Sequence, residues 1–178
     1  MKTRNPTLPF IAAVLSLAMA PSISEAQARR FKTALEGIQE VGSVSTVAEG
    51  KFSAELNADG TEIAYLLEYE NLEGNVTQSH IHLGQLRSNG GISIWLCQTA
   101  TNPSPVATTP FCTEPTSGMV QGTITAADVV GPAGQGIAAG EFAEIVALML
   151  KGATYANVHS SKFPGGEIRG QIATAGPQ

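Results

Sequence analysis

The feature that most constrains this chain is a pair of alternating runs between Tyr155 and Ile172, near the C-terminal end. In each run, polar residues alternate with small or apolar ones. A period of two places alternate side chains on opposite faces of a β-strand, so each run predicts a strand with one polar face. The polar members are Tyr155, Asn157 and His159 in the first run and Glu167, Arg169 and Gln171 in the second.

A tight turn is expected to join the two runs. Pro164-Gly165 favours a type II turn, in which proline fixes φ at the second position and Gly165 takes a positive φ at the third. The resulting hairpin brings one set of polar side chains into a common neighbourhood. That set is Asn157, His159, Glu167 and Arg169.

The chain has three histidines, His80, His82 and His159. His80 and His82 are two apart, so on an extended segment both point the same way. Two imidazoles on one strand face can reach a single ion, and three imidazole nitrogens suit copper or zinc. The third histidine lies on the polar face of the predicted hairpin. The sequence therefore indicates a metal site made of three histidines, with Asn157, Glu167 and Arg169 around it.

Structural roles for the same residues stay open. Each histidine could hydrogen-bond to carboxylates or backbone groups, and Glu167 and Arg169 could form an ion pair on one strand face. A hydrolytic site is disfavoured, because the serines beside the histidines do not lie in a strand–turn–helix nucleophile elbow. The spacing of acidic residues does not indicate a glycosidase pair either.

Residues 1–28 have the form of a secretory signal peptide. Lys2 and Arg4 precede an uncharged apolar run, Leu8 to Ala20, and small residues at Ala26 and Ala28 offer a cleavage site. A membrane anchor is the alternative, but the run is shorter than the roughly 20 residues of a spanning helix. We therefore expect residues 29–178 to form one exported domain, secreted or periplasmic, with no membrane span.

Charge and cysteine content narrow the class of protein further. Without Lys2, Arg4 and Glu25, the 10 basic and 15 acidic residues become 8 and 14, a formal net charge of −6. An acidic chain with no basic block argues against nucleic acid as a partner. Cys97 and Cys112 are the only cysteines, and in an exported protein an even pair predicts a disulfide. A thiolate metal pair is the alternative.

The rest of the chain predicts a mainly β fold. Seven or eight short alternating runs bounded by turn signals are typical of an antiparallel β-sandwich. One helix is expected at 142–150, where apolar residues form a single stripe and Gly152 is placed to end it. The expected strands are 31–36, 47–56, 62–69, 79–83, 92–97, 119–125 and the two runs of the hairpin.

Several of these segments resemble the CHRD domain, which is named for chordin. The carrying motifs are HIHLG at 80–84, LKG at 150–152 and YANVHSSKFPGGEIRGQI at 155–172. The family typically ends with Y-V-N-V-H-T and then N-P-G-G-E-I-R-G-Q, from which this chain departs at Ala156, Ser160 and Phe163. The resemblance covers about residues 31–173. It implies an immunoglobulin-like or superoxide-dismutase-like β-sandwich, and, because chordin binds growth factors, a binding role.

A more distant similarity is to copper–zinc superoxide dismutase, which also carries a strand-borne H-x-H and a later histidine. That similarity implies His80, His82 and His159 as copper ligands and makes Arg169 a candidate for the arginine that guides the anion. No histidine lies between His82 and His159, so the bridging histidine and the zinc loop have no counterpart.

The sequence is compatible with three functions. The favoured one is an exported binding or structural module with a protein or cell-surface partner. The second is a copper-binding protein that uses the three histidines. The third adds dismutase activity to the second, and enzymatic activity is the least favoured.

Overall fold

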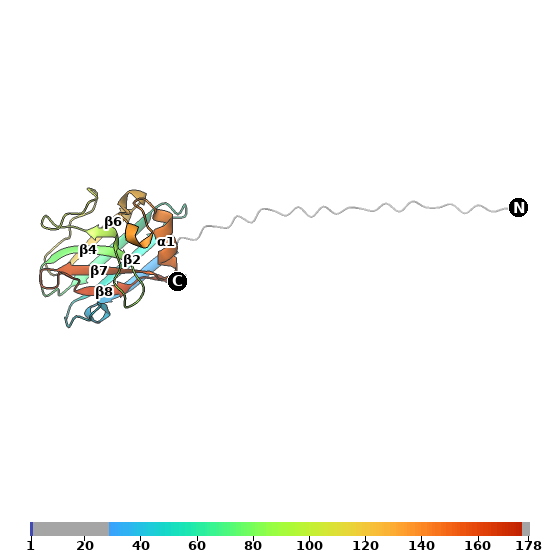
Figure 1. The fold of residues 1–178 in the computed structure, drawn as a ribbon. Helices are drawn as coiled ribbons and strands as arrows, with labels where there is room; N and C mark the ends of the chain where they lie inside the picture. Colours follow the sequence, from blue (N-terminus) through green and yellow to red (C-terminus); the bar gives the residue numbers. More distant parts are fainter. Residues whose placement is uncertain (2–28, 176–178) are drawn as a thin grey trace.

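The computed structural model describes Met1 and residues 29–175. Apart from Met1, the predicted signal peptide lies outside the described residues. The described part of the chain is mainly β, with nine strands, one α-helix and three short 3₁₀ helices (Figure 1). The strands are β1 (Arg29–Glu36), β2 (Glu49–Leu56), β3 (Ile63–Glu70), β4 (Val76–Leu83), β5 (Ile92–Cys97), β6 (Gly118–Ile124), β7 (Thr154–Ser160), β8 (Ile168–Gln171) and β9 (Ala173–Ala175). The helices are α1 (Phe142–Leu150), η1 (Gly37–Gln39), η2 (Ala126–Asp128) and η3 (Ala133–Gln135).

All nine strands belong to one antiparallel sheet. The order is β5-β4-β7-β8-β1-β2-β3-β6, and β9 also pairs with β1. The sheet curves until its two edges come close together, where Ile94 of β5 forms a bridge with Val129, just after β6. This nearly closed, sandwich-like or barrel-like sheet confirms the predicted mainly β fold with one helix.

Alternating apolar side chains build the core inside the curved sheet. On β2, Phe52, Ala54 and Leu56 are buried, whereas the residues between them are exposed. The same period of two buries Ile63 and Leu67 on β3. Residues of alternate parity face opposite sides of a strand, so the sequence pattern alone determines which face forms the core.

Helix α1 buries the apolar stripe that the sequence predicts. Phe142, Ile145, Val146 and Met149 are buried, and the helix lies beside β9. Gly152 takes φ 66° and ends the helix as predicted: its N–H bonds to the Met149 carbonyl, while the next N–H bonds to the Leu148 carbonyl. No helix in residues 29–175 is long and apolar enough to cross a membrane.

Some local features differ from the sequence-based expectation. Strand β4 begins at Val76, earlier than expected, and the connector at 131–140 contains η3. The hairpin turn is not type II, because Gly166 rather than Gly165 takes a positive φ, 127°. The Gly166 N–H bonds to the Phe163 carbonyl across Pro164 and Gly165, which closes the turn without a positive φ at Gly165.

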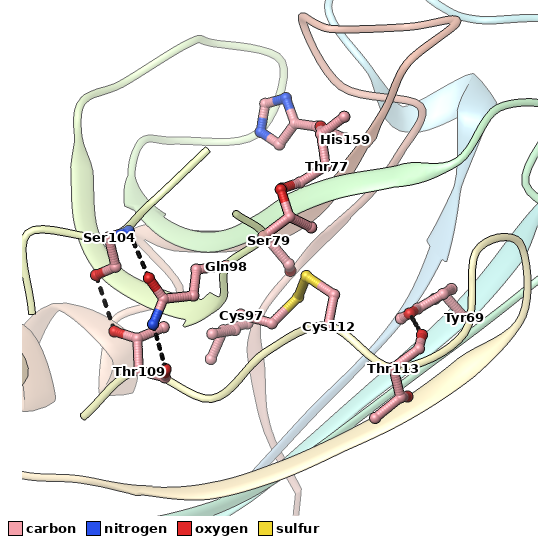
Figure 2. Close-up of a disulfide and its surroundings, with 12 residues drawn as sticks. Tyr69, Thr77, Ser79, Cys97, Gln98, Ser104, Thr109, Cys112, Thr113 and His159 are labelled. Carbon is pink, nitrogen blue, oxygen red and sulfur yellow. Dashed lines mark hydrogen bonds between the residues drawn. A yellow bond between two sulfur atoms is a disulfide. The ribbon is translucent and has the colours of Figure 1, made fainter. Parts of the chain in front are cut away.

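The predicted disulfide is present between Cys97 and Cys112 (Figure 2). It joins the end of β5 to the loop that leads into β6. Inside the closed loop, Gln98 organises the backbone: its side chain donates to the Thr109 carbonyl (2.6 Å) and accepts from the Ser104 N–H (2.9 Å). The disulfide and these bonds order a segment that has no regular strand or helix of its own.

We expect the double substitution Cys97→Ser/Cys112→Ser to lower the free energy of unfolding by about 3 kcal/mol, because the crosslink restricts a loop of about 15 residues in the unfolded chain. Urea denaturation of the wild-type and double-variant proteins measures this difference. Wild-type protein under a reductant is the matched control, since it should behave like the variant. Equal stability of the oxidised and substituted proteins would contradict the prediction.

Candidate metal centre

Strand pairing aligns the polar positions of β4, β7 and β8 on one face of the sheet. Asn157 of β7 lies opposite His80 of β4 on one side and Arg169 of β8 on the other. Two residues further along β4, His82 lies opposite Tyr155 of β7. The intervening residues, among them Ile81, Val158 and Ile168, belong to the hydrophobic core. The polar side chains therefore lie on the outer face of the sheet.

The structure brings all three histidines together, as the sequence indicated. One ring nitrogen from each of His80, His82 and His159 lies within 4.8 Å of the others. His80 Nδ1 and His159 Nε2 are only 3.2 Å apart. In the described residues, no carboxylate or thiolate completes this cluster into a larger group of metal-binding side chains.

Backbone carbonyls orient two of the three rings. His82 Nδ1 donates to the Gly90 carbonyl (2.9 Å), and His159 Nδ1 donates to the Pro164 carbonyl (2.9 Å). With the proton on Nδ1, Nε2 of each ring carries the lone pair; the lone pair of His159 accepts from His80 Nδ1 (3.2 Å), and that of His82 has no partner. Metal-binding histidines are usually fixed in this way, by donation from the other ring nitrogen.

Unpartnered buried nitrogens also mark the cluster. His80 Nε2 and His82 Nε2 are buried and have no hydrogen-bond partner. A buried polar atom without a partner carries a free-energy cost of about 1–3 kcal/mol. A metal ion bound by these rings would give His82 Nε2 the partner that it lacks.

Two aromatic residues pack against the histidines. The Tyr155 ring stacks in parallel on His82, with centroids 4.7 Å apart, and Trp95 meets His80 edge to face at 4.3 Å. Trp95 lies opposite His80 in the pairing of β5 with β4. These contacts restrict the imidazole rotamers and keep water from their sides.

Burial keeps the three imidazoles neutral. It lowers the pKa of His80 to about 2, with added repulsion among the imidazoles when protonated. It lowers the pKa of His82 to about 4, against the opposing effect of the hydrogen bond to Gly90. Burial also lowers the pKa of His159. Protons therefore compete weakly for the ring nitrogens at neutral pH, and the lone pairs stay available.

Arg169 holds in place the loop that orients His82. Its guanidinium donates to the Ser88 carbonyl (2.8 Å), the Asn89 side-chain oxygen (3.2 Å) and the Gln85 carbonyl (3.4 Å). It also lies 3.3 Å over the centre of the Tyr155 ring. Arg169 is 1% exposed, so this cation is held inside the protein.

Gly90 lies in the same loop and has to be glycine. An added Cβ would lie 1.6 Å from the Leu83 carbonyl oxygen. Its N–H donates to the Tyr155 hydroxyl (3.2 Å), while its carbonyl accepts from His82. Gly90 therefore connects the Tyr155 hydroxyl to the His82 imidazole.

Glu167 lies apart from the histidines and from Arg169. It is fully buried, and its Oε1 accepts from the Thr46 hydroxyl and from the Glu73 N–H, both at 2.8 Å. The ion pair considered for Glu167 and Arg169 is wrong: within residues 29–175 the salt bridges join Arg30 to Glu55 and Lys162 to Glu73. Glu167 instead ties the hairpin to two distant loops.

Glu40, which lies in the loop between η1 and β2, was not predicted from any sequence pattern. An added Cβ on Gly166 would lie 2.4 Å from Glu40 Oε1 and 3.0 Å from Asn157 Nδ2, so the carboxyl and the amide lie side by side. Burial raises the pKa of Glu40 to about 7, against the opposing effects of Arg169 and Asn157. No periodicity surrounds Glu40, and only the tertiary fold brings it to Asn157.

Fold and site together define a class: a single-sheet antiparallel β protein with three neutral, buried histidines on the outer face of the sheet. The family model of the CHRD domain matches residues 31–172, and the chain belongs to that family. The matched region includes all three histidines. Comparison with the curated proteins and with the solved structures finds no match.

The pKa shifts predict how pH changes the stability of the metal-free protein. The histidines bind fewer protons folded than unfolded, so they reduce the free energy of unfolding as the pH falls below 6.5. Glu40 has a raised pKa and therefore binds more protons in the folded state than in the unfolded state. Its stabilising contribution to the free energy of unfolding is fully present below about pH 4.5 and is lost as the pH rises through about 7.

Glu40→Gln should therefore stabilise the protein at pH 8 by up to about 3 kcal/mol, at about 1.4 kcal/mol per unit of pKa shift. It should have little effect near pH 3.5, where Glu40 is protonated in both states. Urea denaturation at the two pH values measures this. Glu62→Gln, at an exposed position just before β3, is the control and should leave the stability unchanged at both pH values. An equal effect of Glu40→Gln at both pH values would rule out a buried ionisation.

Proposed function

We propose that this CHRD-domain protein binds copper through His80, His82 and His159. The observation that carries the proposal is the orientation of His82 and His159. Each ring commits Nδ1 to a backbone carbonyl, so Nε2 carries the lone pair: that of His82 has no partner, and that of His159 faces only His80 Nδ1. His80 contributes Nδ1, the nitrogen closest to His159 Nε2.

The donor set favours copper. Imidazole is a good ligand for copper, zinc, iron and nickel, and among divalent first-row ions copper binds a given nitrogen site most tightly. The described residues offer three ligands, which is fewer than a structural zinc site but the number found in catalytic zinc sites, so the preference for copper rests on the order of affinities. Asn157 and Arg169 act around the ligands, Asn157 between Glu40 and the histidine face and Arg169 through the loop at 84–91.

We also propose that the protein acts outside the cytoplasm. The disulfide supports this, because such bonds persist in oxidising compartments. Residues 1–28 have the charge and hydropathy of a cleaved leader, and Arg29 begins β1.

Expression in a bacterium with an outer membrane should yield a periplasmic or secreted protein that begins at Arg29 and contains no free thiol. Intact-mass measurement of the purified protein tests both features. A Lys2→Glu/Arg4→Glu variant, with the positive start of the leader reversed, is the control and should be exported less efficiently. A protein retained in the cytoplasm with Met1 still attached would contradict the assignment.

The decisive measurement is the copper content of the mature chain, purified without a histidine tag. We expect about one copper per chain after equilibrium dialysis, with copper supplied both in air and under ascorbate. His82→Gln should weaken binding by at least about 100-fold, because the loss of a ligand costs more than the 10- to 100-fold typical of its hydrogen-bond partners. Any Cu(II) form should show nitrogen hyperfine structure by EPR.

Lys51→Gln, a change at an exposed position on β2, is the control and should bind copper like the wild type. Absence of copper under both conditions, or equal binding by His82→Gln, would refute the copper site. The histidines would then serve the fold, and the search would turn to protein or cell-surface partners.

A further inference from the structure

The charge around the three histidines indicates which copper ion the site holds. All three donors are neutral imidazole nitrogens, and the residues that carry them are 0%, 8% and 7% exposed. A bound ion would thus be stripped of most of its water and meet no anionic ligand from the described residues. The desolvation free energy of an ion grows with the square of its charge, so it is about four times as large for a divalent ion as for a monovalent one.

A fixed positive charge next to the cluster adds to this difference. The Arg169 guanidinium lies against one face of the Tyr155 ring, and Tyr155 stacks in turn on His82. The oxygens that accept from Arg169 are uncharged, two from backbone carbonyls and one from the Asn89 amide. Coulomb repulsion from this cation is twice as large for a divalent ion as for a monovalent ion.

Glu40 interacts electrostatically with Arg169 but offsets its charge only in part, because burial raises the pKa of Glu40 to about 7 and leaves it partly protonated at neutral pH. Glu40 faces Asn157 and does not belong to the donor cluster. Glu167 accepts from Thr46 and the Glu73 N–H, away from the three rings. The ion pairs of Arg30 with Glu55 and of Lys162 with Glu73 are partly exposed and leave Arg169 without a salt-bridge partner.

The number of ligands points the same way. Cu(II) favours tetragonal sites, and Zn(II) bound by three histidines takes a water as its fourth ligand, whereas Cu(I) is stable with three ligands and needs no water. Here three nitrogens converge under aromatic walls formed by Tyr155 and Trp95. The backbone carbonyls that hold His82 and His159 also limit the rearrangement by which the rings could adopt a planar set.

We propose that the His80–His82–His159 cluster is a three-coordinate cuprous site, which holds Cu(I) in preference to Cu(II) and Zn(II). This inference rests on the copper binding proposed above. It identifies the cargo as monovalent copper, and it assigns Arg169 a second role: to raise the reduction potential of the bound copper through its charge.

The test compares the dissociation constants of one protein for the three ions. Cu(I) affinity is measured anaerobically by competition with bicinchoninate, and Cu(II) and Zn(II) affinities by competition with nitrilotriacetate. We expect a dissociation constant for Cu(I) at least about 100-fold below those for Cu(II) and Zn(II). For copper this ratio corresponds to a shift of about 120 mV in reduction potential, at 59 mV per tenfold change for one electron.

Two substitutions at one position isolate the effect of charge. Arg169→Gln should lower the ratio of Cu(II) to Cu(I) dissociation constants by about tenfold, because it removes the cation, and Arg169→Lys should largely preserve the ratio because it keeps the charge. Lys51→Gln removes an equal charge at a distant exposed position and should leave the ratio unchanged. The ratio is independent of any common loss of affinity that a disturbed loop would cause.

The outcomes separate this inference from the proposed function. If neither copper ion binds, the copper site itself is refuted. If copper binds but Cu(II) or Zn(II) binds as tightly as Cu(I), the copper site stands and the cuprous preference is refuted. If the Arg169 variants do not fold, the wild-type dissociation constants still decide the preference.

Discussion

The register of β7 between β4 and β8 is the constraint on which the rest of the site depends. It sets His80 opposite Asn157 and Asn157 opposite Arg169, so residues far apart in the chain share one face. A shift of β7 by one residue would exchange its faces, moving Asn157 and His159 into the core and Val158 to the outside. The hydrophobic core resists this shift, because Ile81, Val158 and Ile168 are all fully buried. Burial of the apolar face thereby determines the position of the polar one.

The strands position the three histidines, and loops from different parts of the chain supply the hydrogen bonds that orient them. The loop at 84–91 supplies the carbonyl that orients His82, and the hairpin turn supplies the one that orients His159. Arg169 ties the first of these loops to the sheet, and Glu167 ties the hairpin to residues near Thr46 and Glu73. The loops compensate the desolvation of buried polar groups with hydrogen bonds.

Much of this arrangement could be predicted from the sequence, because it follows from local periodicity. Alternation identified the strands, the apolar stripe identified α1, and the spacing of His80 and His82 placed both on one face. The extent of β4, the turn geometry at Gly165 and the partners of Glu167 could not be predicted in this way. Glu40 illustrates the reason: its environment comes from Asn157 and Gly166, more than a hundred residues away, and no local pattern encodes such a contact.

The position of the histidines outside the hydrophobic core has a kinetic consequence. Between the cluster and solvent lie loops, foremost the segment from Gly84 to Gly91, rather than the packed interior of the sheet. A local opening of that segment suffices to expose the imidazoles, and such openings cost less free energy than global unfolding. For the proposed metal site, the contacts of this one loop would therefore set the rate at which an ion is exchanged, independently of the stability of the sheet.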